Sequence, residues 1–286
     1  MNLPAHVGVY GGGRMGAGIA HGFLVSGASV TVIETSEDTA GLARDRVAAS
    51  VARAEERGKL GTATTATTGT TETLGRLTVS TDQGLLADCG LVVEAVPEDT
   101  ALKQHVLTAI EDVAPAAWVA TNTSSLSVDS LASALARPER FIGLHFFNPV
   151  PASELVEIVV GSKTSTELAK LARTWVSELG KTAITVTDSP GFASSRLGVA
   201  IALEAMRMLQ DGVASAEDID TAMTLGYKHP VGPLRTTDIV GLDVRLAIAE
   251  HLARELGERF TPPNILREKV AAGHLGRKTG RGFYSW

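Results

Sequence analysis

The chain has 286 residues, of which 44% are hydrophobic and 20% charged, and its formal net charge is −6. This composition is typical of a globular protein and excludes a chain that is disordered throughout. The length suffices for one large domain or two modest ones. Because binding to a phosphate backbone needs clustered Lys and Arg side chains, this acidic chain is not expected to act on nucleic acid.

The sequence shows no sign of a membrane or secreted protein. No apolar run reaches about 18 residues, the length at which a transmembrane helix becomes a candidate. The first residues, MNLPAHVGVYGGG, lack the basic stretch and long apolar run of a signal peptide. The single cysteine, Cys89, cannot form a disulfide within the chain, which fits a reducing compartment. We therefore expect a cytoplasmic protein without membrane association.

The N-terminal part alternates short apolar runs with amphipathic segments. Apolar runs predict strands at 5–10, 29–33, 91–96, 118–121, 140–146 and 154–160, and helical spacing predicts helices at 16–26, 39–57 and 101–113. Strands that alternate with helices indicate a doubly wound, mostly parallel sheet. Residues 61–73 (GTATTATTGTTET) repeat threonine and alanine too simply to specify a core, so they predict a solvated loop.

The pattern changes after Thr187. Residues 193–210 are apolar almost all round and predict a buried helix, and residues 239–256 predict a further helix. Ser215 is a candidate helix start and Gly226 a candidate end. Proline and glycine in residues 188–191 interrupt both patterns and indicate a domain boundary. The sequence thus predicts an α/β domain at 1–187 and an all-α domain at 188–286.

A glycine-rich loop follows the first predicted strand. Gly11, Gly13 and Gly16 fit the pattern GxGxxG, with Arg14 and Met15 between the last two. The first glycine permits a tight turn, the second lets the backbone approach a pyrophosphate, and the third lets helix and strand pack closely. Because the loop joins a predicted strand to a predicted helix, it indicates a Rossmann-type dinucleotide-binding domain.

An acidic residue at the end of the next strand supports the same assignment. Glu34 lies 18 residues after Gly16, where a carboxylate would bind the 2′ and 3′ hydroxyls of a ribose. The same carboxylate would repel the 2′-phosphate of NADP, so the sequence favours NAD. The alternative is a glycine turn beside a surface glutamate.

A histidine and a glutamate are predicted to face each other. His145 ends the predicted strand 140–146, and Glu157 lies in the strand that returns after residues 148–151 (NPVP). In a hairpin centred near Pro151, their spacing places them opposite each other. A carboxylate fixes the tautomer of an imidazole and stabilises the imidazolium that forms when it accepts a proton. The pair suits a general base in the oxidation of an alcohol; a structural histidine is the alternative.

Other chemistry is less well supported by the sequence. The histidines at 21, 105, 229, 251 and 274 are scattered and lack the spacing of metal ligands. The GxSxG pattern of a serine hydrolase is also missing. We expect no metal.

Five segments of the chain together point to one family. They are GGGRMGAGIA (11–20), VVEAVPEDTALK (92–103), TNTSSLSV (121–128), RFIGLHFFNPVP (140–151) and DSPGF (188–192). The chain resembles the L-3-hydroxyacyl-CoA dehydrogenases, closest to the short bacterial 3-hydroxybutyryl-CoA dehydrogenase type. The resemblance covers nearly the whole chain, through RKTGRGFY (277–284).

The resemblance implies roles on the substrate side. Ser124 would hydrogen-bond the substrate hydroxyl or the carbonyl that it becomes, and Ser50 and Arg57 match positions that contact CoA. One position departs from the family. Where relatives commonly have asparagine before the arginine of the PGFxxNR stretch, this chain has Ser195, a shorter side chain with a single donor.

The resemblance also implies catalytic and cofactor roles. His145 would be the base and Glu157 its partner. Asn148 would lie near the nicotinamide, and Glu98 and Lys103 match positions that contact the cofactor side of the cleft.

These observations predict a two-domain enzyme of fatty acid metabolism. NAD would lie across the carboxyl ends of the strands, and a short-chain 3-hydroxyacyl-CoA would enter the cleft between the domains and be oxidised reversibly to the 3-oxoacyl thioester. The helical domain would form a homodimer. Three alternatives stay open: the acyl group is held on an acyl carrier protein, the substrate is a free sugar acid such as gulonate, or the protein binds a dinucleotide without catalysis.

Overall fold

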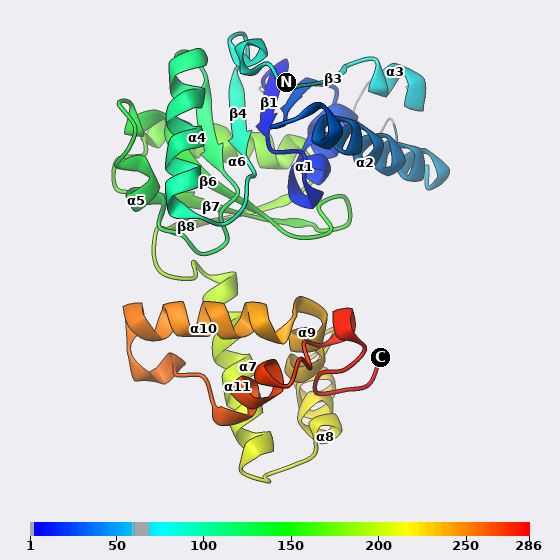
Figure 1. Cartoon of the computed structure of the whole chain (residues 1–286), viewed down its shortest axis with the longest axis vertical. Coiled ribbons are helices and arrows are strands. Elements are labelled where there is room, and N and C mark those ends of the chain that lie inside the picture. Colours follow the sequence, from blue (N-terminus) through cyan, green and yellow to red (C-terminus); the bar gives the residue numbers. More distant parts are fainter. Residues whose placement is uncertain (1–2, 59, 61–68) are drawn as a thin grey trace. The chain divides into compact units, whose positions relative to one another are not determined.

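The computed structural model describes residues 3–58, 60 and 69–286. The chain divides into two compact units, Met1–Asp188 and Ser189–Trp286, shown in Figure 1. The first unit is built on a sheet and the second is helical. The fold class that the sequence predicts, a Rossmann-type sheet domain followed by an all-α domain, is therefore confirmed.

The first unit contains one eight-stranded sheet with the order β3-β2-β1-β4-β5-β6-β7-β8. Neighbouring strands are parallel except for β6 and β7, which form an antiparallel pair. The strands are β1 (His6–Tyr10), β2 (Ser29–Ile33), β3 (Leu77–Ser80), β4 (Leu91–Glu94), β5 (Trp118–Thr121), β6 (Phe141–Phe146), β7 (Leu155–Val160) and β8 (Thr182–Thr187).

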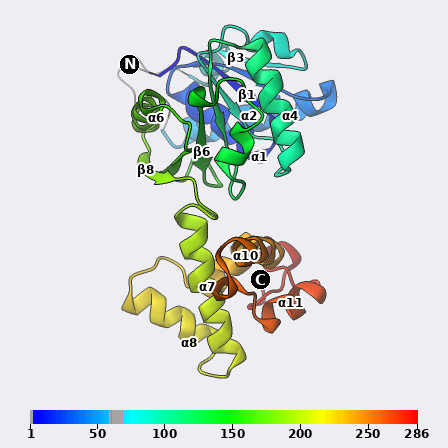
Figure 2. The same cartoon turned by 90° about the vertical axis from the view of Figure 1, so that its left-hand side faces the viewer.

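Helices cover both faces of this sheet. The first three in chain order are α1 (Arg14–Val25), α2 (Glu37–Glu56) and α3 (Thr70–Leu74), followed by α4 (Thr100–Val113), α5 (Val128–Ala132) and α6 (Thr166–Glu178). Side chains of α1, α2 and α6 share one apolar core on one face. On the other face α4 packs on β4 and β5, and α5 on β6. Figure 2 shows α4 and α6 on opposite sides of the sheet.

The sequence patterns miss both edge strands of the sheet. β3 and β8 lie at its two ends, where only one neighbouring strand covers them. β3 contains a threonine and a serine, and β8 contains three threonines. Both strands are only partly buried, so neither shows the apolar run that marks an interior strand. Helix α6 was also not predicted. Residues 61–68 of the predicted loop 61–73 lie outside the described residues. The prediction is wrong for residues 70–73, which belong to helix α3 and include the buried Thr73.

The second unit packs five helices around a core of its own. They are α7 (Ser194–Gln210), α8 (Ala216–Thr221), α9 (Pro233–Val240), α10 (Leu242–Leu256) and α11 (Asn264–Ala271). The prediction of a single helix at 239–256 is wrong for its first residues, because residues 239 and 240 belong to α9 and the helix that follows, α10, begins at Leu242. Gly241, with φ of +110°, ends α9 and begins α10.

Candidate active site

The glycine loop leads from β1 into α1. Gly11 has φ of +95°, a backbone conformation that residues with a Cβ rarely adopt. A Cβ on Gly16 would lie 1.7 Å from the carbonyl oxygen of Gly11. Both positions therefore require glycine, for the reasons that the sequence motif predicts.

The start of α1 is shaped to receive phosphate groups. A Cβ on Gly13 would meet no atom within 4 Å, and no side chain caps the N–H groups of the first turn, which holds Arg14 and Met15. Such N–H groups, at the positive end of the helix dipole, are what a pyrophosphate binds. The loop fits the cofactor that the motif implies.

Glu34 lies beside this loop. Its Oε1 accepts a 2.6 Å hydrogen bond from the backbone N–H of Gly12. Glu34 follows β2, the neighbour of β1, so its carboxylate stands next to the glycine turn. This placement suits a carboxylate that binds the ribose hydroxyls of NAD.

His145 and Glu157 are direct register partners in the antiparallel pair β6–β7, as the hairpin spacing predicts. Nδ1 of the imidazole lies 2.7 Å from Oε2 of the carboxylate, and the two side chains are 7% and 0% exposed. Because a carboxylate accepts, Nδ1 carries the proton of this bond, which leaves Nε2 as the ring nitrogen that could accept a proton. The pair has the geometry that a general base and its partner carboxylate require.

Two further contacts fix the end of β6. Oδ1 of the buried Asn122 accepts a 3.0 Å hydrogen bond from the backbone N–H of Phe146. The ring of Phe147 lies 4.4 Å from that of His145, centroid to centroid. Asn122 was not predicted as a site residue, although its place directly after a buried strand was a signal that could have identified it.

Ser124 lies in the loop that follows β5, and Glu98 holds the backbone of that loop. Oε1 of Glu98 accepts hydrogen bonds from the N–H groups of Ser124 (2.8 Å) and Ser125 (3.1 Å) and from Oγ1 of Thr123 (2.6 Å). The Ser124 hydroxyl has no hydrogen-bond partner within the described part of the chain. It can therefore bond a ligand without first breaking a contact.

Lys103 reaches Glu98 from the first turn of α4. Its side chain is 1% exposed, and Nζ lies 3.4 Å from Oε2 of Glu98. Burial acts to raise the pKa of Glu98, but the Lys103 charge and the hydrogen bonds from residues 123–125 outweigh it, so the pKa is lowered. Glu98 is thus an anion at neutral pH.

The sheet order explains which predicted residues meet. Strands β1, β4, β5 and β6 are parallel neighbours, so their carboxyl ends lie at one edge of the sheet. The loops that carry Gly11, Glu98 and Ser124 leave the sheet at this edge, and His145 lies near the carboxyl end of β6 itself. Asn148, exposed just beyond β6, lies at that edge too.

Three residues that were predicted to bind the substrate do not belong to the loops at this edge of the sheet. Ser50 is half-buried within α2, and Arg57 is exposed at its C-cap. Ser195 lies in the first turn of α7, in the second unit.

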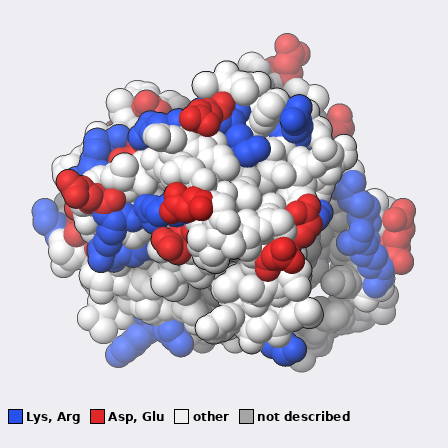
Figure 3. Space-filling model, turned by 90° about the horizontal axis from the view of Figure 1, so that it is seen from below, with Lys and Arg blue, Asp and Glu red and all other residues white. Residues whose placement is uncertain are grey.

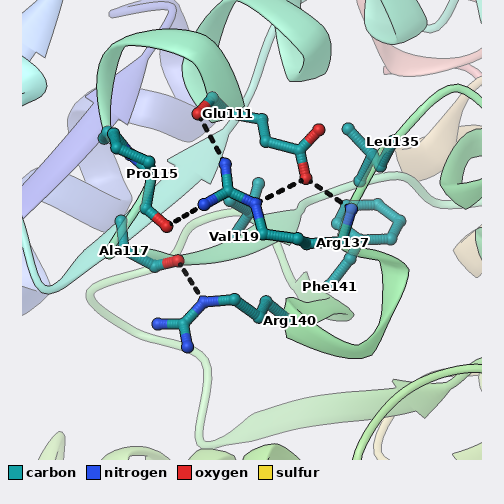
Figure 4. A pocket seen from close by; sticks show the side chains of 9 residues that line it. Glu111, Pro115, Ala117, Val119, Leu135, Arg137, Arg140 and Phe141 are labelled. Atoms are coloured by element: carbon teal, nitrogen blue, oxygen red, sulfur yellow. Dashed lines mark hydrogen bonds and ion pairs between the residues drawn. The ribbon is translucent and has the colours of Figure 1, made fainter.

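A pocket at the opposite edge of the sheet has a structural role (Figure 4). There Arg137 donates to the carbonyl oxygens of Glu111 and Pro115, and Arg140 to those of Ala116 and Ala117. The two guanidinium groups satisfy carbonyls at and just beyond the C-terminal end of α4. The two arginines in this pocket therefore stabilise the end of α4.

Two features are missing from residues 3–58, 60 and 69–286: a candidate metal site and a membrane-spanning helix. No group of three or more His, Cys, Asp or Glu side chains there could hold a metal ion. None of the helices in these ranges is both long and apolar enough to cross a membrane.

The fold and site define a class of oxidoreductase. Residues 6–189 match the model of the 3-hydroxyacyl-CoA dehydrogenase NAD-binding domain, and residues 191–286 match that of the C-terminal domain of the same family. The chain belongs to the 3-hydroxyacyl-CoA dehydrogenase family, and it is an NAD-dependent oxidoreductase.

The chain is similar to several relatives along nearly its whole length. A probable 3-hydroxybutyryl-CoA dehydrogenase of Deinococcus radiodurans is 41% identical over 281 residues, which cover 98% of this chain and 99% of the relative. A 3-hydroxybutyryl-CoA dehydrogenase of Mycobacterium tuberculosis is 41% identical and covered to 98% on both sides. The crystal structure of the (S)-3-hydroxybutyryl-CoA dehydrogenase of Ralstonia eutropha superposes with a TM-score of 0.93 at 39% identity, covering 99% of each chain.

Proposed function

We propose that the enzyme oxidises a short-chain 3-hydroxyacyl-CoA, such as 3-hydroxybutyryl-CoA, reversibly to the 3-oxoacyl thioester, with His145 as the general base. The buried His145–Glu157 pair carries this proposal, because an imidazole held by a carboxylate is suited to accept the proton of an alcohol. The names of the relatives from Deinococcus and Mycobacterium support the short acyl chain.

His145, Glu157 and Ser124 each have a part in removing the proton of the substrate 3-hydroxyl. Bound NAD⁺ supplies the acceptor for the hydride that leaves C3. Nε2 of His145 accepts the hydroxyl proton as the carbonyl forms, and the Glu157 carboxylate stabilises the imidazolium. The Ser124 hydroxyl bonds the substrate oxygen and keeps it in place while the bond order changes. A base of this kind contributes on the order of 10²–10⁴-fold to the rate.

The substitution His145→Gln tests the proposal. Turnover of 3-hydroxybutyryl-CoA with NAD should fall by about 10²-fold or more, because the variant has no base. NAD affinity, measured by calorimetry, should change little, since the glycine loop is made by other residues.

The matched control is His105→Gln, the same change at an exposed position on α4. This variant should have the same turnover of 3-hydroxybutyryl-CoA and the same NAD affinity as the unsubstituted enzyme. If His145→Gln keeps near-normal turnover, or loses NAD binding together with turnover, His145 is a structural residue and the mechanism fails.

Substrate comparison separates the remaining alternatives. We infer that CoA carries the acyl group, and matched 3-hydroxybutyryl thioesters of CoA and of an acyl carrier protein test this directly. Faster turnover of the carrier-protein thioester, or oxidation of gulonate without any thioester, would replace the proposal with the corresponding alternative.

We also infer that the enzyme is a cytoplasmic homodimer. Large apolar side chains of the second unit are exposed, among them Leu197 (62%), Leu225 (68%) and Tyr227 (76%). Apolar groups of this size in water favour association. A second copy of the chain is the partner that we propose for this surface.

A further inference from the structure

Glu94 is a buried carboxylate for which the mechanism above has no use. It ends β4 and is 0% exposed. Oε1 accepts hydrogen bonds from Nζ of Lys103 (2.7 Å) and the backbone N–H of Val96 (2.7 Å), and Oε2 accepts one from Oγ1 of Thr121 (2.6 Å). Every one of these donors belongs to a segment that borders the candidate active site.

The ammonium group of Lys103 joins Glu94 to Glu98. Its Nζ donates hydrogen bonds to Oε1 of Glu94 and, at 3.2 Å, to the carbonyl oxygen of Val96, and it forms an ion pair with Oε2 of Glu98 at 3.4 Å. Because Lys103 is 1% exposed, water cannot replace a lost partner. Removing the charge of Glu94 would leave a buried cation without its nearest counter-ion, which forces the local structure to rearrange.

The same network reaches the loop of Ser124 from two sides. Glu98 binds the N–H groups of Ser124 and Ser125 directly. Thr121, held by Glu94, accepts a 3.3 Å hydrogen bond from the backbone N–H of Thr123. The beginning and the middle of the loop are therefore both fixed by charges that converge on Glu94 and Lys103.

We propose that Glu94 is a positioning residue for Ser124: through Lys103 and Glu98, and through Thr121, it sets where the Ser124 hydroxyl meets the substrate oxygen. This inference rests on the role of Ser124 in the proposed function. Glu94 itself touches no reactant. Removing the charge of Glu94 should lower the rate only by moving the loop of Ser124. A residue that merely stabilises the domain would lower the rate whether or not Ser124 is present.

A double-mutant cycle measures this dependence. Glu94→Gln keeps the shape of the side chain and removes its charge. In the otherwise unsubstituted enzyme it should lower kcat for 3-hydroxybutyryl-CoA by about 10–100-fold, since small displacements of a reacting group cost rates of this order. In an enzyme that already carries Ser124→Ala, the same change should lower kcat by less than about 3-fold, because no hydroxyl is left to misplace.

Glu111→Gln is the matched control, since it removes another buried carboxylate from the same domain. Glu111 lies on α4 and binds the backbone N–H groups of Ala136 and Arg137 at the opposite edge of the sheet. Its effect on kcat should be small and equal in the two backgrounds. If Glu94→Gln does not fold, Thr121→Val replaces it in the cycle, since it removes the hydrogen bond from Thr121 to Glu94. Thr121→Val should lower kcat less than Glu94→Gln, and this decrease should also depend on the presence of the Ser124 hydroxyl.

The outcomes distinguish the two proposals. If Ser124→Ala lowers turnover but Glu94→Gln or Thr121→Val costs the same factor in both backgrounds, the positioning role is wrong and the role of Ser124 stands. If Ser124→Ala leaves turnover unchanged, the role of Ser124 and the positioning role of Glu94 are both wrong. A strong loss from Glu94→Gln that disappears without the Ser124 hydroxyl supports the positioning role.

Discussion

His21 shows how burial alters a side chain that the sequence presents as one of seven histidines. It lies on α1 and is 6% exposed. Burial lowers its pKa to about 4, helped by the nearby charges of Lys181 and Arg53. Its Nδ1 has no hydrogen-bond partner within the described ranges. His21 is therefore a neutral core residue at physiological pH.

The first prediction concerns stability in acid. Between about pH 6.5 and 4 the unfolded chain binds a proton at His21 that the folded chain excludes. The free energy of unfolding should therefore fall as the pH falls through this window, by at most on the order of 3 kcal/mol from this residue. His21→Gln cannot titrate, so urea unfolding at pH 7 and pH 5 should show a smaller loss for the variant.

The exposed His105 supplies the control, because His105→Gln should keep the pH dependence of the original chain. Equal losses of stability between pH 7 and pH 5 for the His21→Gln variant and the original chain would contradict the assignment of a neutral, buried His21.

At the scale of elements, one glycine decides how the second unit is divided into helices. Apolar spacing predicts one helix at 239–256, but Gly241 interrupts it at φ of +110°. A Cβ there would also lie 2.9 Å from Oδ1 of Asp243 and 3.2 Å from Nζ of Lys278. Those two groups form an ion pair at 2.6 Å that ties the C-terminal segment to α10.

The substitution Gly241→Ala should therefore destabilise the second unit by roughly 1–3 kcal/mol, through backbone strain and the displaced ion pair. Urea unfolding followed by circular dichroism measures the loss. Gly226→Ala is the control in the same unit, because a Cβ there would meet nothing within 4 Å and φ is not positive. A loss no larger at Gly241 than at Gly226 would show that the break between α9 and α10 does not require glycine.

At the scale of the whole molecule, the distribution of apolar and charged side chains bears on assembly. Residues 193–210 predict a helix buried all round, yet in α7 Leu197 is 62% and Ile201 37% exposed. They lie one turn apart on the same side of the helix. Figure 3 shows a face on which acidic and basic side chains are interspersed among wide uncharged areas.

Light scattering at micromolar concentration should accordingly give twice the mass of the 29.8 kDa chain. Leu197→Glu places a charge in the proposed interface and should shift the protein toward the monomer. Leu42→Glu, at a leucine of α2 that is 52% exposed in the first unit, should remain dimeric. A monomeric mass for the original chain would refute the homodimer.

Local patterns were sufficient to predict the class of fold and the contact between His145 and Glu157. The glycine loop is defined by residues adjacent in sequence, and its conformational demands are local. The pairing of His145 with Glu157 could be predicted because the two strands are consecutive in the chain and only residues 147–154 separate them, which restricts their register. In both cases the interacting groups lie within about a dozen residues of one another.

Other features depend on which distant segments become neighbours, and only the tertiary structure decided those. Glu98 and Ser124 meet because β4 and β5 are adjacent in the sheet order. The role that we propose for Glu94 rests on its complete burial with Lys103, which no local pattern reports. The edge strands β3 and β8 were not predicted for the same reason. How deeply a strand is buried depends on its neighbours in the sheet, and the sequence reveals burial only where burial requires an apolar run.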